Sequence, residues 1–374
     1  MINFEKESID RNLIKHFLTA LLFLLTAIVC EAQSDNDKLG QITDYLNYLS
    51  PTQFSGVILI EKNDNILFEN SYGYASVEHK IENRINTLFN IASITKTLTA
   101  VATLQLVEKG LLNLEVPIGK YLPDYPNQAV RDSVTAHQLL THTSGLNNFL
   151  VDDYKDKGKL DLREVSDHLP FFVSKPLLFS PGSKYSYSAA GYVVLGLLIE
   201  KLSGSSYHRY INNNVLVKAG MKNTMVIPID SIVKNTASGY TSYFGESDHL
   251  SKNDSFLGIA NPAGFYYSTS KDLLKFTRAL KGYRLLSEML TKKMMSPLVQ
   301  GYHTNYGYGL SIDDRFDQRI VGHTGGWYGI QSELMHFEKD NITVVVLSNV
   351  DTDEDSGMNK VSNYIKHILA NKPL

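Results

Sequence analysis

A serine and a lysine stand one helical turn apart in a stretch that is otherwise free of charge. Between Ile85 and Val107, Lys96 is the only side chain that is charged at neutral pH. The residues after it are apolar on nearly every helical face, which predicts a core helix and a buried amine. Ser93 would lie on the same face, since residues three apart are neighbours, and desolvation would lower the lysine pKa and make the amine a base toward the hydroxyl. The alternative is a lysine that reaches the surface beside an ordinary serine.

Two further segments carry residues that suit chemistry. In residues 181–200, Pro181 and Gly182 mark a turn before a charge-free helix, and Tyr187 stands at the helix entrance, where its phenol can point into a cleft. In residues 321–337, a glycine-rich edge leads into an alternating strand, and glycines let a substrate backbone approach and pair with it. The residues of this edge are His323, Thr324, Gly325 and Gly326. The alternatives are a core tyrosine and a plain hairpin turn with a solvated histidine.

Taken together and in this order, the three segments resemble motifs of the serine β-lactamase and penicillin-binding-protein superfamily. The closer likeness is to its class C-like branch, which includes D-alanyl-D-alanine carboxypeptidases and esterases. The chain matches a Ser-x-x-Lys motif at Ser93–Lys96, a Tyr-x-Asn motif in part at Tyr187–Ala189, and a Lys/His-Thr-Gly motif at His323–Gly325. Further landmarks lie at residues 110–123, 139–146 and 261–276. The likeness extends from about residue 35 to the C-terminus.

The strand and helix patterns predict a mixed α/β (α+β) fold with one antiparallel sheet built from both ends of the chain. Alternating segments around Asn63–Asn65 predict a hairpin near the N-terminus, and residues 306–350 predict further strands. Residues 35–49 and the residues after Val361 have apolar side chains at helical spacing and predict terminal helices that flank the sheet. The middle, roughly residues 95–300, is mostly helical. The resemblance implies the same β-lactamase/transpeptidase-like architecture, with the three motifs meeting in a cleft between this lobe and the sheet.

The resemblance implies acyl transfer through a covalent ester on Ser93. Lys96 and Tyr187 would share the proton transfers, and the sequence leaves open which of them is the base. The backbone N–H groups of Ser93 and Gly326 would stabilise the oxyanion, on an edge that Gly325 keeps open to the substrate. The expected activity is therefore that of a serine hydrolase on a peptide, amide or ester.

Two departures from the family pattern bear on the substrate. Ala189 replaces an asparagine that, by resemblance, hydrogen-bonds the acylamino group, and a methyl group cannot make that bond. By the same resemblance His323 and Thr324 face the substrate carboxylate, and a neutral imidazole at His323 holds it less firmly than a lysine would. Both changes favour a peptidoglycan-type D-peptidase, a carboxypeptidase or an esterase over a true β-lactamase. A non-hydrolysing penicillin- or peptidoglycan-binding sensor is the alternative of another class.

The composition excludes several other kinds of protein. With 374 residues, 43% of them hydrophobic, the chain can form a large core. The net charge is -3 and the sequence has no Lys/Arg run, so binding to nucleic acid is not expected. The histidines are scattered, so neither a metal nor another cofactor is expected. The expected partner is a small-molecule or peptidoglycan-peptide substrate.

Residues 1–32 predict an export signal. The apolar run 17–29 is too short for a membrane span and suits the central region of a signal peptide. Cleavage after Ala32 would leave residues 33–374 as the β-lactamase-related hydrolase domain of a periplasmic or secreted protein. A retained segment or a lipidated Cys30 is the alternative and would anchor the protein to a membrane. Cys30 is the only cysteine, so a mature chain would have no internal disulfide.

Overall fold

The computed structural model describes residues 33–150, 162–228, 230–242, 250–254, 258–351 and 357–372, together with His16 and Thr19. The segment 1–32, for which export or anchoring is predicted, lies outside the described residues apart from those two. The chain divides into two compact units, one of Ser50–Asn363 and one of Met1–Leu49 with Tyr364–Leu374. Among the helices that are described, none is long and apolar enough to cross a membrane.

The smaller unit pairs a helix from each end of the chain. Residues 33–48 are helical, in agreement with the prediction for residues 35–49, and helix α10 spans Met358–Leu369. The rings of Tyr45 and Tyr364 stack with their centroids 4.1 Å apart. Both predicted terminal helices are thus confirmed.

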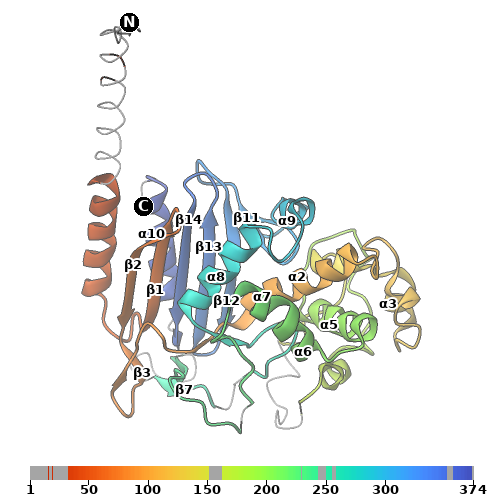
Figure 1. The fold of residues 1–374 in the computed structure, drawn as a ribbon. Coiled ribbons are helices and arrows are strands. Elements are labelled where there is room, and N and C mark those ends of the chain that lie inside the picture. Colours follow the sequence, from red (N-terminus) through yellow and green to blue (C-terminus); the bar gives the residue numbers. More distant parts are fainter. Residues whose placement is uncertain are drawn as a thin grey trace, which may run out of the picture. The chain divides into compact units, whose positions relative to one another are not determined.

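An eight-stranded antiparallel sheet is the centre of the larger unit (Figure 1). Strand β1 pairs with β14 in the register Leu59↔Val345, so the N-terminal hairpin and the C-terminal strands form one sheet, as predicted. The two turn residues of that hairpin, Asn63 and Asp64, have positive φ, which a tight two-residue turn requires. In spatial order the strands are β2 (Asn65–Tyr72), β1 (Gly56–Lys62), β14 (Ile342–Ser348), β13 (Ile330–Phe337), β12 (Ile320–Trp327), β11 (Ser311–Asp313), β10 (Asn305–Tyr306) and β9 (Val299–Gln300).

Beside the large sheet, the described residues of this unit form three small sheets. The pairing that matters for the site joins β5 (Phe89–Asn90) to β8 (Tyr267–Ser268), because β5 leads directly to Ser93. The other short strands are β3 (Tyr74–Ser76) with β4 (Ile81–Glu82), and β15 (Val350–Asp351) with β6 (Tyr240–Thr241) and β7 (Ser251–Lys252).

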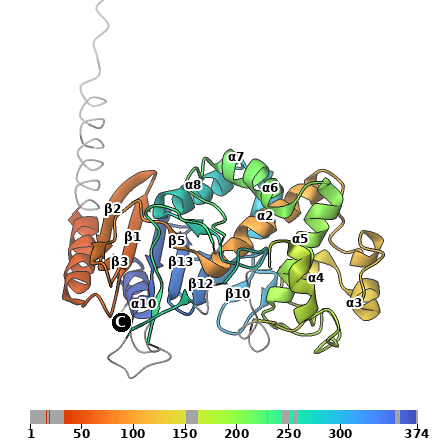
Figure 2. The ribbon, with the colours of Figure 1, turned by 90° about the horizontal axis from the view of Figure 1, so that it is seen from below.

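A helical lobe lies beside the sheet (Figure 2). At its centre, helix α2 (Thr95–Glu108) packs against α5 (Ala189–Ser203), and every residue of α2 from Thr95 to Leu106 is buried. The predicted core helix is therefore confirmed, and so is the helical middle of the chain. The described residues also form α3 (Gln128–Ser133), α4 (Ala136–Leu140), α6 (Tyr207–Ile211), α7 (Val217–Ala219), α8 (Ser270–Lys281) and α9 (Glu288–Met294), with short 3-10 or π turns at Ala92–Ile94, Ile118–Lys120, Val165–Phe171 and Asn212–Leu216.

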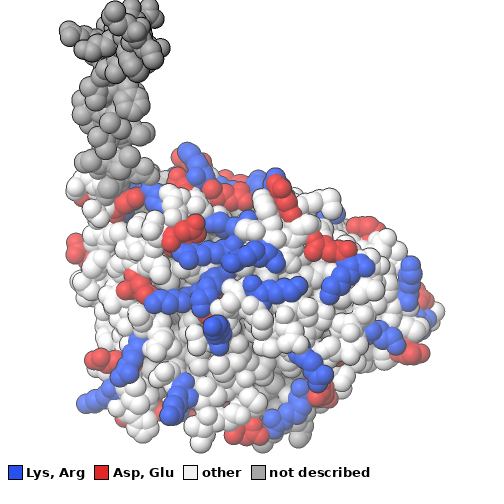
Figure 3. Space-filling view, in the orientation of Figure 1, with Lys and Arg blue, Asp and Glu red and all other residues white. Residues whose placement is uncertain are grey.

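Helix α8 lies across one face of the sheet and packs against β1 and β14. Lys and Arg side chains gather over it, with acidic side chains among them (Figure 3). Lys271 Nζ lies 3.0 Å from Glu69, and Lys275 Nζ lies 2.8 Å from Asp272. The sequence shows no run of basic residues here, because other residues separate Lys271 from Lys275. The two lysines are neighbours only on the surface of the helix. Because Lys271 and Lys275 are each paired with a carboxylate, these two lysines add little electrostatic attraction for an anionic partner.

Candidate active site

The turn that carries Ser93 is strained and held from both sides. Strand β5 ends at Asn90, a 3-10 turn follows, and α2 begins only at Thr95. Ala92 has a φ of +40°, a left-handed conformation that costs a residue other than glycine about 1–2 kcal/mol. Asn90 Oδ1 accepts a hydrogen bond from Ala92 N at 2.9 Å, and Ala92 O accepts one from Phe265 N at 3.1 Å. These bonds hold the turn in shape and thereby fix the direction of Ser93.

Lys96 is fully buried in the first turn of α2. Its Nζ lies 3.0 Å from Ser93 Oγ and donates a hydrogen bond to Ala263 O at 2.5 Å. Its other neighbours are aromatic, with the ring centroids of Tyr187 and Tyr192 at 4.9 and 5.6 Å from Nζ. Burial, with no carboxylate among the described residues to oppose it, lowers the pKa of Lys96 to about 7. An amine that loses its proton near neutrality beside a hydroxyl is the arrangement that general-base chemistry needs.

Tyr187 lies just before α5 and contacts the same pair. Its hydroxyl is hydrogen-bonded with Ser93, and Lys96 Nζ lies over its ring. Burial raises the pKa of Tyr187, and the hydrogen bond with Ser93 opposes this only in part. The phenol therefore keeps its proton at neutral pH. The three residues predicted to be catalytic meet around the Ser93 hydroxyl, although Tyr187 comes from a distant part of the chain.

Strand β12 presents a free edge beside the Ser93 turn. Strand β13 pairs with β12 along its whole length, whereas β11 pairs only with Ile320–Gly322, so in the described structure residues 323–327 have no strand partner on that side. Thr324 and Gly326 are exposed. An ideal Cβ on Gly325 would lie 2.3 Å from Ile91 O and 3.1 Å from Ser93 N. Only glycine therefore lets the strand pass this closely to the turn.

His323 lies on β12 with its side chain turned away from solvent. It is buried, its Nδ1 donates to Thr324 O at 2.5 Å, and its Nε2 accepts from the Tyr306 hydroxyl at 2.9 Å. Burial, aided by the nearby Lys96 charge, lowers the pKa of His323 to about 3, so the ring is neutral. Both ring nitrogens are therefore bonded in this structure, and a role of His323 toward the substrate carboxylate stays a prediction. The ring lies near those of Tyr187 and Tyr306, and Thr324 is the exposed polar residue of this motif.

Ala189 is the first residue of α5 and is fully buried, so this structure shows no exposed methyl group there for an acyl side chain to contact. Its backbone N–H donates to Asn148 Oδ1 at 3.4 Å. A carboxamide therefore does lie at this helix terminus, but it comes from the segment that follows the landmark 139–146. The sequence gives no signal for this contact beyond two adjacent asparagines.

Two further residues around Tyr187 are missed by reasoning from the sequence. His142 lies with its ring 4.3 Å from that of Tyr187. Tyr306, on β10, contacts His142 and His323 through its hydroxyl. The signal for His142 is present, because it lies in the landmark 139–146. Tyr306 gives no signal, because it is one of 22 tyrosines.

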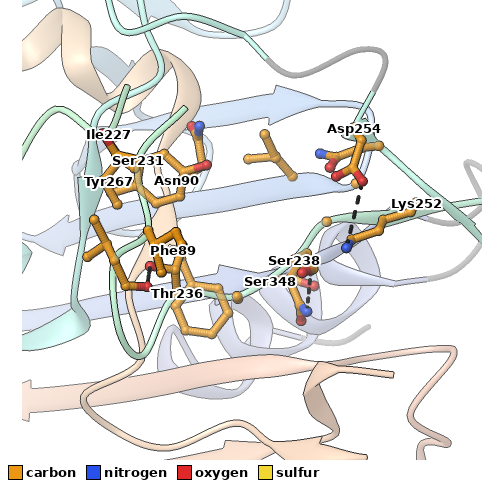
Figure 4. A pocket seen from close by; sticks show the side chains of 18 of the residues that line it. Phe89, Asn90, Ile227, Ser231, Thr236, Ser238, Lys252, Asp254, Tyr267 and Ser348 are labelled. Carbon is orange, nitrogen blue, oxygen red and sulfur yellow. Dashed lines mark hydrogen bonds and ion pairs between the residues drawn. The ribbon is translucent and has the colours of Figure 1, made fainter. Parts of the chain in front are cut away.

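A separate cavity of about 460 Å³ is lined in part by the two residues of β5, Phe89 and Asn90. Its walls include Asn90, Tyr267, Lys252 and Asp254, of which the last two form an ion pair (Figure 4). Ser93, Lys96 and Tyr187 do not line it, so it is distinct from the site around the Ser93 hydroxyl. Among the described residues, no three His, Cys, Asp or Glu side chains gather as metal ligands.

The chain is similar to known proteins over most of its length. The Beta-lactamase family model matches residues 50–363. The chain is 30% identical over 338 residues to penicillin-binding protein 4* of Bacillus subtilis (strain 168), covering 86% of this chain and 73% of that protein. A penicillin binding protein from Bacillus halodurans has a structure similar to this one, with a TM-score of 0.78 and 32% identity over 88% of this chain and 99% of the other. The D-amino acid amidase from Ochrobactrum anthropi SV3 shares the fold, with a TM-score of 0.77 and 23% identity over 90% of this chain and 99% of the other.

The chain therefore belongs to the beta-lactamase family. It is a hydrolase with the β-lactamase/transpeptidase-like fold, and the resemblance drawn from its three motifs is confirmed.

Proposed function

We propose that the protein cleaves a peptide, amide or ester through an acyl-enzyme on Ser93. The observation that supports this most is the buried Lys96, whose Nζ lies 3.0 Å from Ser93 Oγ and forms no ion pair with a described carboxylate. A buried amine without an anionic partner costs several kcal/mol as the charged form. A folded chain that keeps such an amine next to a single hydroxyl is arranged to deprotonate that hydroxyl.

Lys96 is the proposed base, because its pKa of about 7 leaves a large neutral fraction, whereas Tyr187 keeps its proton. In acylation, Ser93 Oγ forms a bond with the carbonyl carbon while its proton passes to Lys96 Nζ. The carbonyl oxygen becomes an oxyanion, which the N–H groups of Ser93 and Gly326 would stabilise. As the C–N or C–O bond breaks, the leaving group takes the Tyr187 proton, and the phenolate takes one from the Lys96 ammonium.

Deacylation uses the same groups in the opposite direction. A water molecule gives a proton to the Lys96 amine and attacks the ester carbonyl. The bond to Ser93 Oγ breaks, and Ser93 recovers a proton from the Lys96 ammonium. The products are the free acid and the starting state of the enzyme.

For the substrate we propose a peptidoglycan-type D-peptide or a small ester. The free edge of β12 at residues 323–327 can pair with an extended peptide backbone, and the exposed Thr324 hydroxyl can bind the carboxylate of a C-terminal residue. The names of the similar proteins, penicillin-binding proteins and a D-amino acid amidase, are consistent with amide substrates that contain D-residues. We also propose that residues 1–32 direct export or anchoring, which N-terminal sequencing of the mature protein would test.

Labelling with a fluorophosphonate tests the proposal. Mass spectrometry should find the adduct on the peptide that contains Ser93, and Ser93→Ala should lose the adduct and about 10⁴-fold or more of the activity. Ser133→Ala, a change at an exposed serine of α3, is the matched control and should keep both. An adduct that persists in Ser93→Ala would contradict the proposal.

Three substrates assayed side by side identify the class of activity. A D-alanyl-D-alanine peptide, a short-chain nitrophenyl ester and a chromogenic cephalosporin would report a peptidase, an esterase and a β-lactamase. We expect the peptide or the ester to be the better substrate. A labelled Ser93 with no turnover of any of the three would indicate a binding sensor.

A further inference from the structure

His142 accepts hydrogen bonds from the residues directly before and directly after Tyr187. His142 O accepts a hydrogen bond from Ser186 N at 2.8 Å, and His142 Nδ1 accepts one from Ser188 N at 3.1 Å. The two rings lie 4.3 Å apart. One fully buried residue therefore binds the amide on each side of Tyr187 and also packs against its ring. Its φ of +58° is a left-handed conformation that is uncommon for residues other than glycine, and such conformations cluster at functional sites.

The hydrogen bonds of His142 continue to strand β12, which lies beside the Ser93 turn. Because Nδ1 accepts a hydrogen bond from the Ser188 amide, the neutral His142 ring carries its own proton on Nε2, which donates a hydrogen bond to the Tyr306 hydroxyl at 3.2 Å. His323 Nδ1 donates to Thr324 O, so His323 Nε2 must accept from the Tyr306 hydroxyl at 2.9 Å. These hydrogen bonds form a chain from the Tyr187 loop to β12, and the Tyr306 hydroxyl in its middle is also hydrogen-bonded with Tyr192.

We propose that His142 is a positioning residue, which fixes Tyr187 over Ser93 and couples that position, through Tyr306 and His323, to the β12 edge. The inference rests on the proposed function. An apolar ring of the same size would fill the space but would leave the Ser188 N–H without its acceptor. The hydrogen bonds that His142 makes on both sides of Tyr187 are therefore more specific than filling the space would require. The titratable groups that face His142 are Lys96, Tyr185, Tyr187, Tyr192, Tyr306 and His323.

Two substitutions at this position separate positioning from packing. His142→Asn suits a left-handed φ, and its side-chain oxygen can take the place of Nδ1 as acceptor for Ser188 N–H. His142→Phe keeps a ring of similar size but has no acceptor. We expect His142→Phe to lower kcat by about 100-fold with KM within about threefold, since a misplaced catalytic group costs about that much. We expect His142→Asn to recover at least about tenfold of that loss.

Turnover is measured per molecule that a fluorophosphonate labels, so that unfolded protein does not count. Tyr306→Phe, which breaks the chain beyond His142 and keeps the packing, is the second variant if His142→Phe does not fold, and it should lower kcat by about tenfold. A wild-type kcat per labelled site in both His142→Phe and Tyr306→Phe would overturn the inference, as would equal losses in His142→Asn and His142→Phe. Failure of the proposed function is recognised separately, because the wild-type protein would then show either no label on Ser93 or no turnover of any substrate.

Discussion

The rate of acylation of Ser93 is predicted to follow the titration of Lys96. Burial lowers the pKa of Lys96 to about 7, and only the neutral amine can accept the Ser93 proton. With that pKa the neutral fraction is about 9% at pH 6, about 50% at pH 7 and about 91% at pH 8. The acylation rate constant should therefore rise about tenfold between pH 6 and pH 8 and then level off.

The same burial predicts a change of stability with pH. The unfolded chain keeps the Lys96 proton up to the ordinary pKa of 10.5, whereas the folded protein releases it near pH 7. Between these values the unfolded state binds more protons, so raising the pH stabilises the folded state by up to about 1.4 kcal/mol per pH unit. Below pH 7 the amine is protonated in both states, and its contribution no longer changes. Lys96→Met, which has similar length and no charge, should remove this part of the pH dependence.

Quenched-flow labelling with a fluorophosphonate from pH 5.5 to pH 9 measures the acylation step directly. Tyr187→Phe is the matched control, because it removes the neighbouring phenol and leaves Lys96 in place. Its rate should be lower, but the midpoint of the pH profile should stay near 7. A rate that does not change between pH 6 and pH 8, or a midpoint above pH 9, would refute the reasoning. Either result would mean that Lys96 does not titrate near neutrality as the base.

Two substitutions test the packing around the site. In Gly325→Ala the new Cβ would lie 2.3 Å from Ile91 O, so β12 must move away from Ser93, and we expect a stability loss of about 1–3 kcal/mol and a kcat lowered by about 100-fold. Gly326→Ala, where a Cβ meets nothing within 4 Å, is the control for stability and should keep the thermal midpoint, and equal midpoints for the two variants would contradict the argument. Ala189→Asn places a carboxamide in a fully buried position and should lower the free energy of unfolding in urea by about 1–3 kcal/mol. The ratio of kcat/KM for acylamino substrates to that for simple esters should stay the same, and a change in that ratio would mean that the position does face the substrate.

Local patterns predict the elements and the chemistry that belongs to a single segment. The burial of Lys96 follows from the apolar residues around it in the sequence, and its contact with Ser93 follows from their spacing. The hairpin at Asn63–Asn65 follows from turn residues between two alternating runs. In each case the determining residues lie within one or two turns of each other, so the sequence carries the information.

Side-chain directions and burial that depend on contacts between distant segments could not be predicted from local patterns. The direction of His323 is decided by a hydrogen bond with Tyr306, which belongs to another strand, and no periodicity reports that bond. The burial of Ala189 depends on how α5 packs in the lobe, whereas the motif alone placed it in the cleft. The role inferred for His142 required three hydrogen bonds, two with the segment around Tyr187 and one with β10. The start of α2 at Thr95, after Ser93 rather than before it, depends on bonds to Asn90 and Phe265.

The closure of the sheet between β1 and β14 also determines when the protein can become active during its synthesis. Ser348 Oγ donates to Ser55 O at 2.9 Å across a separation of 293 residues. At about 5–20 residues per second, a ribosome needs about 15–60 s to make the chain between them. Over that time β1 (GVILIEK) has an unpaired edge, which makes the nascent chain prone to aggregation. Strand β12, which completes the site beside Ser93, is also made late. A ribosome-bound chain should therefore be inactive until its last strands have emerged, and truncation before β14 should give an insoluble product rather than a smaller enzyme.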